Sequence, residues 1–176
     1  MPTPPTDQLT RFQLDDITQG SSPLLVGSFG LLESLHCASY QQAELMLLDR
    51  LPTKLGRYYL IFRLDALWAN GGMQAVALDK DSEASAKLLD RTIEAFEFFG
   101  AAAGAGLLRE IVPIAVQAAR EIDILVERDA PDEAFEPVWA RLDAYNDRYD
   151  SMFVEIYPAI LADIHCHPTD WQTNDS

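Results

Sequence analysis

Eight carboxylate side chains gather in the last third of the sequence and could bind cationic groups of a partner. Five crowd one short segment, and three more follow at intervals of four and then three residues. They are Glu127, Asp129, Asp132, Glu133, Glu136, Asp143, Asp147 and Asp150. Residues 121–176 hold fourteen Asp and Glu against three Lys and Arg, so this third supplies −11 of the net charge of −15. Such a field attracts basic partners and repels nucleic acid and acidic membranes.

These carboxylates present negative charge at regular intervals, as the phosphates of DNA do. Carboxylates one helical turn apart lie about 5 to 6 Å apart along the axis, and each strand of duplex DNA carries a phosphate about every 3.4 Å. Asp143, Asp147 and Asp150 share one stripe if a single helix continues through them. The alternative interpretation is that the acidic residues only face solvent and serve solubility, and that Asp132 or Asp150 caps a helix.

Two glycine-containing segments invite a phosphate-binding interpretation. Neither Asn70-Gly71-Gly72 nor the stretch from Gly100 to Gly106 has Gly-x-Gly-x-x-Gly spacing or a Walker lysine, and no predicted strand precedes the triplet. We therefore expect the triplet to end a helix, with Asn70 hydrogen-bonded inside the turn and a glycine in the left-handed conformation. The second stretch predicts close helix packing or a tight connection.

A metal site is the remaining chemical alternative. His165-Cys166-His167 with Asp163 forms one local cluster, whereas zinc sites draw four ligands from two places in the chain. His36-Cys37 could supply a second half if the first and last helices meet. We expect no metal and no cofactor, because a cysteine such as Cys37 is commonly a small buried residue and tail histidines are commonly solvated.

Helices must position these residues, because most of the chain after residue 31 shows helical periodicity and no segment alternates as a strand does. The predicted helices cover residues 31–51, 54–69, 82–99, 105–127 and 137–145, and a final helix covers 152–164. Pro113 should kink or divide the fourth helix, and Asp81 or Ser82 should cap the third. We expect an all-α, single-domain multi-helix bundle over residues 1–176, with loose termini at 1–5 and 169–176.

A family resemblance adds to this interpretation. It rests on the helix that reaches Asn70-Gly71-Gly72, the helix closing on Phe99-Gly100-Ala101, and the late segment Leu142-Asp143…Arg148-Tyr149. With these motifs, residues 60–164 resemble a family of small bacterial helical proteins of unknown function, one of which is described as a DNA mimic. The family typically has an aromatic residue after the triplet, where this chain has Met73. The resemblance implies a helical fold, often dimeric, with no known cofactor.

We therefore expect an acidic interaction protein, not an enzyme, that occupies the basic DNA-binding surface of a transcription regulator or nucleoid protein. The alternatives are an immunity-type inhibitor of a basic toxin or nuclease, and a small-molecule binder or enzyme with a helical pocket lined by Tyr58, Tyr59 and Trp68. We expect a homodimer that does not bind nucleic acid or membranes. A cytoplasmic location is expected, because the N-terminus lacks signal-peptide features and the apolar run 23–32 is too short to cross a bilayer.

Overall fold

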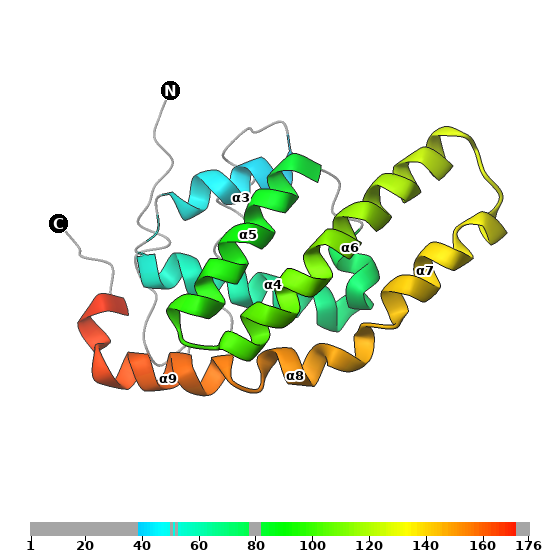
Figure 1. Ribbon diagram of the computed structural model, residues 1–176. Helices are drawn as coiled ribbons and strands as arrows, with labels where there is room; N and C mark the ends of the chain where they lie inside the picture. The colour runs from blue at the N-terminus through cyan, green and yellow to red at the C-terminus, as the bar shows by residue number, and fades with distance from the viewer. Residues whose placement is uncertain (1–38, 50, 52, 78–81, 172–176) are drawn as a thin grey trace, which may run out of the picture.

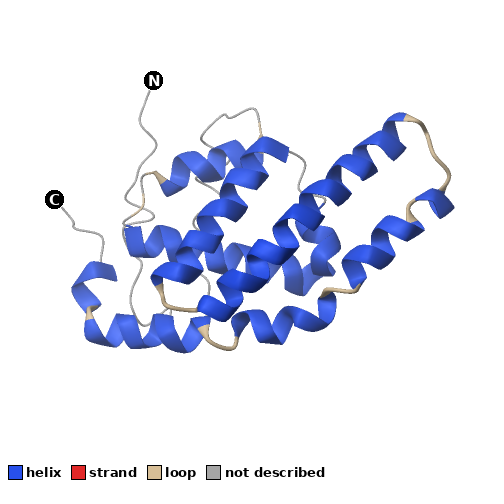
Figure 2. Ribbon diagram, in the orientation of Figure 1, coloured by secondary structure: helices blue, strands red, loops and turns tan. Residues whose placement is uncertain are grey.

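The computed structural model describes residues 39–49, 51, 53–77 and 82–171, and in this part it contains helices and no strand (Figure 2). The α-helices are α3 (Tyr40–Leu48), α4 (Thr53–Ala77), α5 (Ser82–Phe98), α6 (Ala102–Glu127), α7 (Glu136–Asp143), α8 (Tyr149–Phe153) and α9 (Ile156–Cys166). Three short 3-10 helices, η2 (Asp132–Ala134), η3 (Asn146–Arg148) and η4 (Pro168–Trp171), complete the order. The predicted all-α fold is confirmed. The predicted helix start at residue 31 lies outside the described residues. The predicted cap of α5 also lies outside the described part, because Asp81 and the side chain of Ser82 are not included in it.

One hydrophobic core joins the helices. α5 packs against both α4 and α6, and α8 and α9 run along one side of this group (Figure 1). Leu64, Phe96, Ile111, Leu142 and Ile160, from five different helices, are each at most 1% exposed. Burying a side chain of this size stabilises the fold by about 1.5–3 kcal/mol. The apolar stripes of the helices are therefore the main source of cohesion.

Glycine allows α5 and α6 to pack as close neighbours. α5 ends in a tight turn in which Gly100 has a φ of +78° and its N–H donates to the carbonyl oxygen of Glu97 at 3.0 Å. At Gly104, a Cβ would lie 2.6 Å from the ring of Phe96 and 2.8 Å from the carbonyl oxygen of Met152. The predicted tight connection and close packing are confirmed.

α6 carries the acidic segment away from the rest of the bundle. Pro113 does not divide this helix, which runs unbroken from Ala102 to Glu127. By length and composition α6 alone, among the described helices, could cross a membrane; seven of its residues are buried against the other helices. Its C-terminal part and α7 form a projecting helical hairpin, residues 118–143, here called the arm (Figure 1).

The predicted final helix is wrong in one respect, because it is two helices. Val154 and Glu155 form a turn between α8 and α9. In a continuous helix the ring of Pro158 would clash with the carbonyl group of Val154, four residues earlier. Proline also has no N–H to donate to that carbonyl group. The break therefore falls where this proline would have interrupted a continuous helix.

The start of the expected loose C-terminal tail is ordered by a buried tryptophan. Residues 169–171 belong to η4, and Trp171 is 1% exposed and donates its Nε1–H to Asp163 at 2.8 Å. Lys54 at the start of α4 lies 2.7 Å from Asp163 and 3.1 Å from Asp170. Burial alone would raise the pKa of Asp163, but the hydrogen bonds from Lys54 and Trp171 hold this pKa below its ordinary value. The expectation of a loose tail is therefore wrong for residues 169–171.

Candidate functional site

The structure places all eight predicted contact carboxylates on the surface, in two groups at opposite ends of α7. The tip cluster surrounds the connection between α6 and α7 and comprises Glu127, Asp129, Asp132, Glu133 and Glu136. The base cluster follows the end of α7 and comprises Asp143, Asp147 and Asp150. Figure 1 shows the first group at the far end of the arm and the second where the arm rejoins the bundle.

The turn at the tip forms without glycine. Asp129 takes a φ of +50°, and its N–H donates to the carbonyl oxygen of Val126 at 3.1 Å while that of Ala130 donates to Leu125 at 3.0 Å. This is the Schellman arrangement that closes helices, and Asp tolerates positive φ better than most residues. Glu127 and Asp129 thereby place negative charge at the C-terminus of α6, where the helix dipole disfavours it. Helix stability therefore does not explain these two carboxylates.

The arm is a packed hairpin. Val138 and Leu142 of α7 are buried, and the adjoining Phe135 and Trp139 rings stack with their centroids 6.3 Å apart. Arg141 of α7 pairs with Glu121 of α6, and its hydrogen bond lowers the pKa of that carboxylate. These contacts hold the tip cluster away from the bundle on two helices.

The eight carboxylates form no ion pair, whereas several other acidic residues of the described part do. Elsewhere, Glu44 lies 2.7 Å from Arg63 and Glu121 pairs with an arginine, as described above. No member of either cluster forms an ion pair within the described ranges, although Arg128 and Arg148 are close in sequence. The two clusters therefore present negative charge that is not neutralised by neighbouring cations.

The predicted single stripe of carboxylates is wrong. α7 ends at Asp143, and the 3-10 helix η3 separates it from α8, so no one helix carries Asp143, Asp147 and Asp150. α7 itself aligns Glu136 with Asp143, which are seven residues and about 10.5 Å apart on one helical face. The capping alternative is also wrong, because neither Asp132 nor Asp150 occupies the position preceding its helix.

The Asn70-Gly71-Gly72 triplet ends the first helical segment of α4 at a kink, as predicted, and a short second segment follows. Asn70 donates its Nδ2–H to the carbonyl oxygen of Ala66 at 2.7 Å, as expected for a side chain bonded inside the turn. Gly71 and Gly72 leave the helical conformation, and Gly72 combines a φ of +60° with a ψ of −159°. After this kink the chain returns to the helical conformation, and the second segment of α4 runs to Ala77.

Residues 49–163 match the family model described as DMP19-like protein. The chain belongs to the DMP19-like protein family. The resemblance based on the triplet and the late Leu142–Tyr149 segment is thereby confirmed, since this is the helical family that includes a DNA mimic. No curated protein and no solved structure matches the chain. The matched region of this DMP19-like chain contains the triplet, the whole arm and both acidic clusters.

The histidine and cysteine cluster of this family member lies on the surface. His165, Cys166 and His167 are exposed, and His167 Nδ1 lies 3.2 Å from Asp163 Oδ1. Within the residues that the structure describes, no group of three or more His, Cys, Asp and Glu side chains is arranged to hold a metal ion. The suggested second half, His36-Cys37, lies outside those residues.

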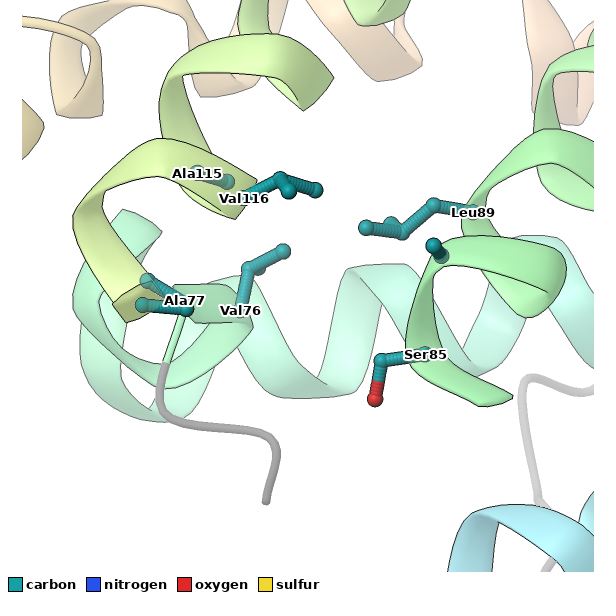
Figure 3. Close-up of a pocket in the computed structure, with 8 residues that line it drawn as sticks. Val76, Ala77, Ser85, Leu89, Ala115 and Val116 are labelled. Carbon is teal, nitrogen blue, oxygen red and sulfur yellow. The ribbon is translucent and has the colours of Figure 1, made fainter. Parts of the chain in front are cut away.

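The predicted pocket of Tyr58, Tyr59 and Trp68 is wrong, because these three side chains are packed into the core. A cavity of about 20 Å³ lies between α4, α5 and α6, bounded by Val76, Leu89 and Ala115 among others (Figure 3). Ligand pockets span about 300–1,000 Å³, so this cavity is too small for a substrate. A more open groove of about 280 Å³ lies beside the start of α4 and includes Arg57, Arg91, Asp49 and Glu94; Asp49 and Arg91 pair at 3.0 Å.

Sequence reasoning missed a polar cluster that ties α4 to the C-terminal helices. The hydroxyl groups of Tyr149 and Tyr157 each donate to one oxygen of Asp65. Burial, followed by the hydrogen bond to Asp65, raises the pKa of Tyr149 to about 12. Tyr149 also meets Trp68 edge to face, with ring centroids 6.2 Å apart. No periodicity marks these partners, because they are 84 and 92 residues apart in sequence.

Proposed function

We propose that this protein binds the basic DNA-binding surface of a transcription regulator or nucleoid protein through the tip and base clusters, and so acts as a DNA mimic. The single observation that carries the proposal is the set of eight exposed carboxylates without an ion-pair partner in the described part of the chain. Membership of the DMP19-like family supports the same function. Binding rather than catalysis is the proposed mode of action, in the cytoplasm and as a homodimer.

Electrostatics gives the proposal its mechanism. A DNA-binding protein gains much of its affinity from Lys and Arg side chains that contact phosphates. Carboxylates at both ends of α7 offer those side chains negative charge separated by about 10 Å. To compete with DNA, the protein needs only to occupy the Lys and Arg side chains of the partner that would otherwise contact phosphates. Neither recognition of bases nor a cofactor is needed for this. Binding should weaken as salt screens these charges.

The proposal is tested by capture from host lysate on the immobilised protein, followed by elution with duplex DNA and then with rising salt. A basic DNA-binding protein that duplex DNA releases supports mimicry. A basic toxin or nuclease that duplex DNA does not release would instead support the immunity-type alternative. If the parent protein retains no basic protein, the proposal fails.

Matched charge variants separate the site from total charge. The site variant carries Glu127→Gln, Asp132→Asn and Glu133→Gln. Its control carries Asp90→Asn, Glu94→Gln and Glu110→Gln, which removes the same number of exposed carboxylates outside the clusters. We expect the site variant to bind the captured protein more weakly and with a flatter salt dependence, and the control to bind like the parent. Equal loss in both variants would assign the effect to net charge.

A further inference from the structure

The break in α4 receives a side chain from the base of the arm. Asn146 of η3 lies against Gly72, where a Cβ would be 2.5 Å from its Oδ1 and 2.8 Å from its Nδ2. The N–H of Met73 donates to the same Oδ1 at 2.9 Å. Gly72 therefore leaves the space that Asn146 fills, and Asn146 accepts from an amide at the start of the resumed helical turn.

The same contact includes a carboxylate of the base cluster. Asp143 Oδ1 accepts hydrogen bonds from Gln74 Nε2 at 2.9 Å and from Asn146 Nδ2 at 3.1 Å. Both donors are neutral, so the negative charge of Asp143 remains available. Its second oxygen, Oδ2, has no hydrogen-bond partner among the described residues, so this oxygen can accept a contact from a cationic side chain of a partner.

We infer that Asn146 is a positioning residue for the acidic surface, because it fixes the base of α7 to the break in α4. The role of Asn146 in partner binding rests on the proposed function, whereas its contact with α4 is observed in the structure. α6 ties one edge of the arm to the bundle, and the Asn146 contact ties the other edge. α7 is about 12 Å long, so a 10° tilt at its base would displace the tip cluster by about 2 Å. Such a shift changes the spacing of charge between the two clusters.

Two substitutions remove the contact from opposite sides. Asn146→Ala deletes the side chain that enters the break, and Gly72→Ala fills the break with a methyl group that displaces it. Asn146→Asp keeps the shape and the acceptor for Met73, but replaces the donor to Asp143 with a second negative charge. Ser39→Ala is the control, because it removes the hydrogen bond from the N–H of Gln42 to the Ser39 hydroxyl at the start of α3, outside the arm and this contact.

The distance between spin labels on α7 and α5 measures the arm directly. Labels are attached at Ala140→Cys and Lys87→Cys, both exposed sites, after Cys37 and Cys166 are replaced by Ser. Circular dichroism confirms that each variant is folded. We expect a single narrow distance in the parent and in the Ser39→Ala control, and a broadened or shifted distance in the Asn146 and Gly72 variants. Unchanged distances in folded Asn146→Ala and Asn146→Asp would overturn the inference.

Affinity for the captured basic protein supplies the functional half of the test. We expect Asn146→Ala to weaken binding by about fivefold with its net charge unchanged, whereas Ser39→Ala binds like the parent. A displaced arm with unchanged affinity would also overturn the positioning role. If the parent captures no basic protein but the distances shift, the proposed function fails while Asn146 is still shown to fix the arm.

Discussion

The packing of α6 against α5 and α8 can be tested with two glycines in the same helix. At Gly104 a Cβ would approach the buried Phe96 ring to 2.6 Å and the Met152 backbone oxygen to 2.8 Å, whereas at Gly106 nothing lies within 4 Å. Replacing either glycine by alanine favours the helix by about 0.5–1 kcal/mol. Only Gly104→Ala also overpacks the core, which costs about 1–3 kcal/mol because backbone and a fully buried ring cannot move aside easily.

The helix-propensity gain is shared, so the difference between the two variants isolates the overpacking cost. Each kcal/mol corresponds to about 2–4 °C in a domain of this size, so Gly104→Ala should melt about 2–12 °C below Gly106→Ala. Thermal denaturation followed by circular dichroism measures this difference, and Gly106→Ala should melt at or above the parent temperature. Equal melting temperatures for the two variants would refute the close approach of α6 at Gly104.

Two further predictions concern titratable groups. Because the folded-state pKa of Tyr149 is raised, its contribution to stability is present below pH 10 and is lost as pH rises toward about 12; absorbance at 295 nm should show its late ionisation. Asp65→Asn should bring this ionisation nearer to pH 10 and lower the free energy of unfolding in urea by about 1–3 kcal/mol. The depressed pKa of Asp163 stabilises the fold above the ordinary pKa of an aspartate, and that stabilisation is lost as pH falls through the lower folded value. Acid should therefore release Trp171 from its contact with Asp163, seen as a fluorescence change that is absent in Trp171→Phe.

Local sequence signals predicted the helices well where a single element determines the outcome. Helical periodicity predicted the helix over residues 82–99, which is α5, and Gly100 marks its end. The predicted final helix over residues 152–164 is instead divided into α8 and α9, because Pro158 disfavours helical hydrogen bonding four residues before its own position.

Contacts between distant segments could not be predicted from those signals. Asn146 and Gly72 meet across 74 positions of the sequence, and nothing in the local pattern of either residue indicates its partner. Likewise Tyr58 and Trp68 have the composition of a binding pocket, yet their rings pack against other aromatic side chains in the core. The exposure of the eight carboxylates followed from their polarity, whereas their division into tip and base clusters required the bend after Asp143.

Displacement of DNA from the captured regulator or nucleoid protein is the decisive experiment for DNA mimicry. Fluorescently labelled duplex DNA is bound to that protein, and the acidic protein is titrated in at fixed salt while fluorescence anisotropy is followed. We expect the parent and the Asp90, Glu94 and Glu110 control to release the DNA alike, and the Glu127, Asp132 and Glu133 variant to require a higher concentration. DNA that stays bound while the acidic protein joins the complex would contradict the claim that both occupy the same basic surface.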